Sequence, residues 1–184
     1  PYEHITPQEA CICEPVSCVL HSVETVDPQF GDTCVIIGAG IMGLLHVQLC
    51  VKKGCLVIVT DMDEERLKLA KTMGAQYTIN PHREHAEKRI LELTHSRKAQ
   101  VVFDTTPAAA VVEEACRYVG NTGKLMIYSG IYPNKPVQLD AHWIHKGSIQ
   151  ILGTANSNDR DFMRAAVMIS EGILDVKPFI SNVF

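Results

Sequence analysis

The sequence has 184 residues, of which 46% are hydrophobic and 21% are charged, with a formal net charge of −4. This balance is typical of a globular protein with room for one sizeable core, and the small acidic excess gives no electrostatic basis for binding nucleic acid or an anionic membrane. No apolar run approaches the roughly 18 residues of a membrane span. Seven cysteines without C-x-x-C spacing predict a reduced, cytoplasmic protein.

The segment ahead of the first predicted strand reads as a short helix. Thr6, Pro7 and Glu9 have the pattern of a capping box with a proline in the first turn. We expect this helix to be interrupted near Glu14-Pro15, because a proline removes an N–H group and disfavours helical geometry in the residue before it. The spacing alone favours a Glu14 carboxylate that points to water, since buried acids are uncommon.

The next segment carries three glycines in a G-x-G-x-x-G pattern. Residues 34–37 are apolar and β-branched and predict a strand, whereas residues 44–53 predict a helix. Gly38 permits a tight turn, Gly40 lets the backbone approach a pyrophosphate, and Gly43 lets the helix pack closely on the strand. The helix N-terminus offers N–H groups and a partial positive charge to phosphates, so the pattern is typical of dinucleotide binding.

A second apolar run, residues 56–61, predicts a strand that ends in Asp61. This acid lies 18 residues after Gly43, close to the roughly 20 expected for a carboxylate that binds the adenosine ribose. A helix N-cap or a solvated turn remains an alternative for Asp61. An acid here repels a 2′-phosphate, and no Arg or Lys occurs between it and Arg66, so the sequence favours NAD over NADP.

Predicted strands and helices alternate along the rest of the chain. Strands are expected over 77–79, 100–104, 124–129 and 149–152, and helices over 63–74, 82–96, 107–118 and 159–171. This alternation predicts an α/β fold with a doubly wound, mostly parallel sheet, whose ligand lies at the carboxyl ends of the strands. A methyltransferase also combines a glycine turn with an acid after its second strand, but the third glycine, Gly43, favours a dinucleotide.

Together these residues resemble the zinc-dependent medium-chain dehydrogenases, closest to the sorbitol (polyol) and threonine dehydrogenase branch. The resemblance covers about residues 6–184. Its most specific pieces are Glu14-Pro15 with His21, the glycine motif 38–43, Asp61 with Arg66-Leu67, Gly74-Ala75, and Gly172 with Lys177-Pro178.

The resemblance implies a Rossmann-type cofactor domain flanked by strips of a separate catalytic domain. Residues 1–25 would be a remnant of that catalytic domain, residues 26–172 the dinucleotide-binding domain, and residues 173–184 the return towards the catalytic domain. Because the chain begins at Pro1 rather than methionine, we expect it to be a processed or truncated piece of a longer protein.

The family also implies roles for individual residues. The pyrophosphate would be held by Gly38, Gly40, Ile41, Met42 and Gly43, and the adenosine end by Asp61 and Arg66. The nicotinamide half would lie along Thr105, Thr106, Ser129, Gly130, Leu152 and Gly153. One departure is Pro107, which stands where a glycine is usual after the second threonine.

The resemblance changes the interpretation of Glu14, which becomes a ligand of a catalytic zinc ion. The family's other zinc ligands, its proton-relay hydroxyl and its four-cysteine zinc lobe have no counterpart in this sequence. We therefore expect no catalytic residues in this chain alone, no bound zinc, no turnover, and disorder or rearrangement around residues 1–20.

For the complete protein, the resemblance implies transfer of hydride from a secondary alcohol, such as a polyol or amino alcohol, to NAD. The expected partner is this small molecule, with no nucleic acid or membrane, in a homodimer or homotetramer that pairs the strand at 149–152 with its copy. Two alternatives remain open, a free-standing NAD-sensing module and a zinc-free reductase of the same superfamily.

Overall fold

The computed structural model describes residues 4–180 and contains one parallel six-stranded sheet in the order β3-β2-β1-β4-β5-β6. The strands are β1 (Thr33–Ile37), β2 (Leu56–Thr60), β3 (Tyr77–Ile79), β4 (Ala99–Asp104), β5 (Val119–Ile127) and β6 (Gln150–Gly153). All six expected strands are present, and the strand order reverses between β1 and β4. The prediction of a doubly wound sheet is therefore confirmed.

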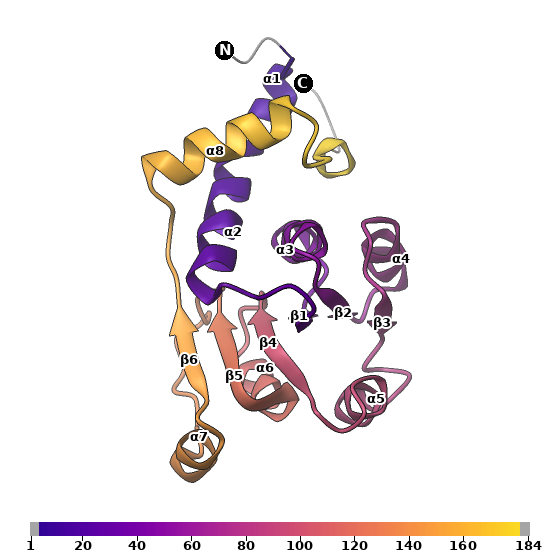
Figure 1. Ribbon diagram of the computed structural model, residues 1–184, viewed down its shortest axis with the longest axis vertical. Coiled ribbons are helices and arrows are strands. Elements are labelled where there is room, and N and C mark those ends of the chain that lie inside the picture. Colours follow the sequence, from indigo (N-terminus) through magenta and orange to yellow (C-terminus); the bar gives the residue numbers. More distant parts are fainter. Residues whose placement is uncertain (1–3, 181–184) are drawn as a thin grey trace.

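Helices cover both faces of the sheet (Figure 1). One face carries α2 (Cys13–Val26), α3 (Ile41–Lys52) and α4 (Glu64–Thr72), with α8 (Asp159–Ser170) lying across α2. The other face carries α5 (Ala86–Leu93), α6 (Ala109–Ala115), η1 (Cys116–Tyr118) and α7 (Ala141–Gly147). The short elements α1 (Pro7–Ala10) and η2 (Lys177–Phe179) lie near the chain ends. Within residues 4–180 there is no helix with the length and apolarity needed to cross a membrane.

Two hydrophobic clusters fill the layers between sheet and helices. The first includes Val19 of α2, Leu45 of α3 and Phe103 of β4. The second includes Val35 of β1 and Ile90 of α5. Because side chains on both faces of the central strands are buried, these strands have the continuous apolar sequences that the chain shows.

Several helices and strands begin at other residues than expected. α3 begins at Ile41 rather than residue 44, because Gly40 already acts as its N-cap. α5 begins at Ala86 rather than residue 82, because His85 is its N-cap and accepts a hydrogen bond from the Lys88 amide. β5 begins five residues early, at Val119, beside an irregularity in its pairing with β4. Because α3 begins at Ile41, the second half of the glycine motif forms the N-terminus of this helix.

The predicted capping box at the N-terminus is present. The Thr6 hydroxyl oxygen accepts from the Glu9 amide at 3.2 Å, and the Thr6 amide donates to the Glu9 carboxylate at 2.9 Å. The predicted interruption of this helix is present but lies at Cys11 and Ile12, between α1 and α2, rather than at Glu14-Pro15. Pro15 lies in the first turn of α2, where a missing N–H group leaves no intrahelical bond unmade. The expected disorder is wrong over residues 4–20, since α1 and α2 form there. A rearrangement relative to the complete protein stays a prediction, and residues 1–3 lie outside the described part.

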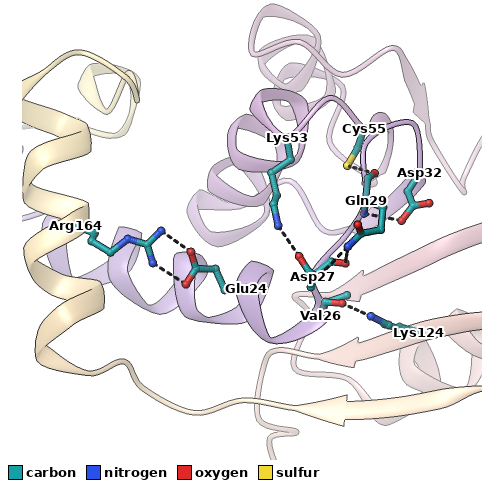
Figure 2. Close-up of polar contacts among 9 residues, drawn as sticks. All are labelled: Glu24, Val26, Asp27, Gln29, Asp32, Lys53, Cys55, Lys124 and Arg164. Carbon is teal, nitrogen blue, oxygen red and sulfur yellow. Dashed lines mark hydrogen bonds and ion pairs between the residues drawn. The ribbon is translucent and has the colours of Figure 1, made fainter.

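Polar contacts fix the C-terminal end of α2 to the rest of the molecule (Figure 2). Glu24 of α2 pairs with Arg164 of α8, with an Nη1–oxygen distance of 2.6 Å. Asp27, just after α2, pairs with Lys53 at 3.1 Å, and Lys124 of β5 donates to the carbonyl oxygen of the last residue of α2. The helix that carries Glu14 at its other end is therefore held against both α8 and the sheet.

Candidate functional site: a dinucleotide crevice at the strand-order reversal

The three glycines of the motif occupy three different environments. Gly38 has φ +93°, and its amide donates to the Thr60 carbonyl oxygen at 2.8 Å. A Cβ on Gly38 would lie 2.7 Å from the Thr105 hydroxyl oxygen. A Cβ on Gly43 would lie 1.9 Å from the Gly38 carbonyl oxygen. Gly40 has an ordinary φ of −71°, and a Cβ there would meet no atom within 4 Å. The close packing around Gly38 and Gly43 therefore requires glycine at both positions, whereas the space beside Gly40 is empty.

The open space at Gly40 lies at the N-terminus of α3. Ile41, Met42 and Gly43 form the first turn, so their N–H groups have no intrahelical acceptor. These groups and the helix dipole together make a site for an anion such as a phosphate. Ile41 and Met42 are half-buried and Gly43 is buried, so the turn is fixed by the packing of α3 on the sheet.

Asp61 follows β2 and contacts the glycine turn. Its Oδ2 accepts from the Ala39 amide at 2.6 Å, and its Oδ1 accepts from the Asp63 amide at 2.8 Å. The N-cap of α4 is Asp63 rather than Asp61, and Asp63 accepts from the Glu65 amide at 2.8 Å. Because a carboxylate has about four acceptor positions, Asp61 keeps capacity for further donors. Arg66 lies nearby with a side chain that is 57% exposed.

A cavity of about 540 Å³ opens beside Asp61 and the glycine turn. Predicted cofactor residues that line it are Gly38, Gly40, Asp61, Arg66, Thr105 and Thr106, and Pro107 also borders it. Pro107 therefore takes part in the wall of this cavity in place of the glycine that is usual there.

A second cavity, of about 580 Å³, lies at the carboxyl ends of β5 and β6. The predicted residues Ser129, Gly130, Leu152 and Gly153 all line it. Ile41, Met42 and Gly43 line neither cavity and lie in the first turn of α3. The two cavities are neighbours, because the Ser129 hydroxyl donates to the Thr105 carbonyl at 2.9 Å. The fold therefore brings all the predicted cofactor residues to one edge of the sheet, on either side of the strand-order reversal.

Tyr128, which the sequence analysis missed, lies between the glycine turn and the start of α2. Its hydroxyl is 3.4 Å from the Met42 sulfur, and its ring meets the His46 ring edge-on at 4.8 Å. Burial raises the pKa of Tyr128, and the nearby Cys18 and Glu14 raise it further. No signal in the sequence marked this position, because Tyr128 lies within the predicted strand 124–129, whereas the observed β5 ends at Ile127.

His46 is fully buried in α3 and bridges two helices. Its Nδ1 lies 2.8 Å from the Met42 carbonyl oxygen, and its Nε2 lies 3.1 Å from the Ser22 hydroxyl. A carbonyl only accepts, so Nδ1 carries the proton and Nε2 accepts from the hydroxyl. Burial lowers the pKa of His46 to about 4, which keeps the ring neutral near pH 7. The ring holds the first turn of α3 against α2.

Glu14 is exposed and lies on the side of α2 near Tyr128. Its Oε1 accepts from the Cys18 thiol at 3.2 Å. A carboxylate oxygen is a normal zinc ligand, so Glu14 fits one position of a zinc site, but a catalytic site needs about three protein ligands. Within residues 4–180, no group of three or more His, Cys, Asp or Glu side chains is arranged to hold a metal ion. A zinc ion at Glu14 would therefore need ligands from outside these residues.

Comparison with known proteins gives a consistent result. A family model described as "Zinc-binding dehydrogenase" matches residues 42–171. Sorbitol dehydrogenase of Bacillus subtilis (strain 168) is 29% identical over 181 residues, which cover 98% of this chain and 51% of that protein. L-threonine 3-dehydrogenase of the same strain is 30% identical over 182 residues, 97% of this chain and 51% of that protein.

A solved structure supports the same family assignment. A protein of Sinorhizobium meliloti 1021 assigned as a zinc-binding dehydrogenase, crystallised with NADP, superposes with a TM-score of 0.86 and 25% identity over 91% of this chain and 49% of that chain. The chain spans about half the length of the curated relatives it matches.

Proposed function

This chain belongs to the zinc-binding dehydrogenase family, and from that premise we propose that it forms the NAD(H)-binding half of an alcohol or polyol dehydrogenase. The observation that carries the proposal is the meeting of the glycine turn, the N-terminus of α3 and Asp61 at the strand-order reversal between β1 and β4. Parallel sheets of this order bind dinucleotides across that point. Calorimetric titration of the chain with NADH tests it, and an absence of binding would contradict it.

In this proposal the two cavities hold the two halves of the cofactor. The adenosine lies in the cavity beside Asp61 and Arg66, the pyrophosphate on Gly38 to Gly43, and the nicotinamide half reaches from Thr105 and Thr106 into the cavity beside Ser129. Gly130, Leu152 and Gly153 form further parts of the wall of this second cavity.

The same proposal divides the chain into parts. The dinucleotide-binding domain covers residues 26–172, and residues 1–25 and 173–184 belong with a catalytic domain. The physiological partner is a small secondary alcohol such as a polyol.

We expect the chain to prefer NADH over NADPH by at least about tenfold in Kd, roughly 1.4 kcal/mol. The Asp61 carboxylate has acceptor positions left for ribose hydroxyls, and its charge opposes a 2′-phosphate. Calorimetric titration with both cofactors measures the ratio. Asp61→Asn should reduce this preference, whereas Asp140→Asn, at the exposed N-cap of α7, should leave it unchanged. Equal or tighter binding of NADPH by the wild type would contradict the role of Asp61.

Glu14 is proposed as a zinc ligand of the complete enzyme. When bound, zinc supplies a Lewis acid that lowers the pKa of the alcohol. Glu14→Ala should reduce the zinc content and turnover of the full-length protein together while NADH affinity persists, because the glycine turn is unchanged. Glu24→Ala, at the other end of α2, should keep its zinc. Full metal content and turnover in Glu14→Ala would make Glu14 a solvated helix acid, and a zinc-free wild type would favour a zinc-free reductase.

The edge position of β6 underlies a proposed homodimer. Among residues 4–180, β6 pairs with β5 alone, and Ile151 and Leu152 are half-buried in the single chain. An unpaired apolar edge favours pairing with a second copy. Sedimentation velocity at micromolar concentrations should therefore show a dimer, or a tetramer built from two dimers. A monomer at every accessible concentration would contradict the pairing.

We also propose that the protein is located in a reducing compartment. All seven cysteines are free thiols, and Cys13, Cys34, Cys50 and Cys55 are buried among apolar side chains. Thiols in such places act as small hydrophobic groups. A cytoplasmic location suits this use of cysteine.

A further inference from the structure

Asp104 is a buried acid at the end of β4 whose two oxygens have different surroundings. The side chain is 0% exposed. Oδ1 accepts from the Thr106 amide at 2.9 Å and from the Thr106 hydroxyl at 2.7 Å. Oδ2 is buried and has no hydrogen-bond partner among residues 4–180. A buried polar atom without a hydrogen-bond partner destabilises the folded state and is uncommon, so the environment of Oδ2 needs an explanation.

The backbone around Asp104 joins the carboxyl ends of three strands. The Asp104 carbonyl oxygen accepts from the Tyr128 amide, at the end of β5, at 3.0 Å. The next residue, Thr105, donates to the Ile37 carbonyl, at the end of β1, from its amide at 3.0 Å and from its hydroxyl at 2.8 Å. The same hydroxyl fills the space that a Cβ on Gly38 would need. The position of the Thr105–Thr106 turn therefore determines how the two cavities meet.

We infer that Asp104 is a positioning residue for the dinucleotide, which holds the Thr105–Thr106 turn through Oδ1 alone. This inference rests on the proposed function, because the turn lines the cavity assigned to the cofactor. Asp104 lines neither cavity itself and acts on the ligand through Thr106.

The surroundings of Asp104 leave Oδ1 as its point of contact with the turn. No ion pair joins Asp104 to a Lys, Arg or His side chain in the described part of the chain. Burial raises the pKa of Asp104, whereas the two Thr106 donors lower it. Both Thr106 donors use one acceptor oxygen, and an asparagine side chain offers the same oxygen.

The test compares Asp104→Asn with Asp104→Leu, which keeps the branched arrangement of side-chain heavy atoms, is larger, and has no acceptor. NADH affinity is measured by calorimetric titration, and folding by thermal unfolding. Asp104→Asn should bind NADH within about threefold of wild type, whereas Asp104→Leu should bind at least about tenfold more weakly, because both Thr106 donors lose their acceptor. Asp161→Asn is the matched control, since Asp161 is a buried acid outside both cavities that pairs with His21 at 2.8 Å, and it should leave NADH affinity unchanged.

Each other outcome overturns the inference. Wild-type affinity in Asp104→Leu would show that the acceptor is not needed. Loss of binding in both variants would show that a negative charge, rather than the Oδ1 acceptor, is what the site requires. If Asp104→Leu does not fold, Thr106→Val decides, since it removes one donor and should weaken NADH binding about threefold, whereas unchanged binding contradicts the role.

Failure of the proposed function can be told apart from failure of this inference. If the wild type binds no dinucleotide, the proposed function is wrong. Hydrogen exchange at the Thr106 amide then tests the positioning role separately. Protection should be similar in wild type and Asp104→Asn and lost in Asp104→Leu, and equal protection in all three would overturn it.

Discussion

Replacing Gly40 with valine should abolish NAD(H) binding and leave the fold nearly unchanged. Gly40 has a φ of −71°, which any residue adopts, and in the described part of the chain no atom outside its chain neighbours and the backbone of α3 lies within 4 Å of the position of its Cβ. The valine side chain therefore fits the empty turn. In the proposed function, the same space is the approach of a pyrophosphate to the N-terminus of α3. We expect Kd for NADH to rise at least about 100-fold, roughly 2.7 kcal/mol.

Calorimetric titration with NADH and thermal unfolding measure the two halves of this prediction. The free energy of unfolding should change by no more than about 1 kcal/mol, because valine is a poorer N-cap than glycine. Gly40→Ala is the graded control, and its affinity should fall between those of wild type and Gly40→Val, since its side chain fills less of the space. NADH affinity equal to wild type in Gly40→Val would remove the phosphate-binding interpretation of the turn.

Gly43→Ala should have the opposite effect and destabilise the fold strongly. A Cβ on Gly43 would lie 1.9 Å from the Gly38 carbonyl oxygen and 2.9 Å from the Gly38 carbonyl carbon. These are backbone atoms, so they move only if α3 moves away from β1. The better helix propensity of alanine, worth about 1 kcal/mol, is too small to offset that displacement. We expect a loss of at least about 3 kcal/mol, at the upper end for overpacking.

Urea and thermal unfolding test this expectation, and the melting temperature should fall by roughly 6–12 °C. Gly40→Ala is again the matched control, because it adds the same methyl group three residues earlier, into open space. A melting temperature in Gly43→Ala equal to that of wild type would contradict the close contact between α3 and the glycine turn.

The sequence by itself determined the features that depend on neighbouring residues. The apolar β-branched runs predicted β1, β2 and β3, and Thr6 and Glu9 were correctly predicted as the capping box of α1. Gly38 was expected to permit a tight turn and has a positive φ. A side chain that caps a helix reaches an amide two or three residues away, and a turn depends on its own backbone angles. Such preferences are expressed before the chain is folded, so a local pattern is enough to predict them.

The tertiary structure alone decided which distant groups meet at the crevice. Asp61 reaches the Ala39 amide 22 residues away, and Tyr128 reaches Met42 across 86 residues. Asp104 reads as one more residue of an apolar strand, and only the burial of its Oδ2 sets it apart. These contacts follow from the order and register of the strands, which bring carboxyl ends far apart in the sequence to one edge. Because no local preference encodes that order, neither the hydrogen bonds of the carboxylates nor their burial could be predicted from the sequence.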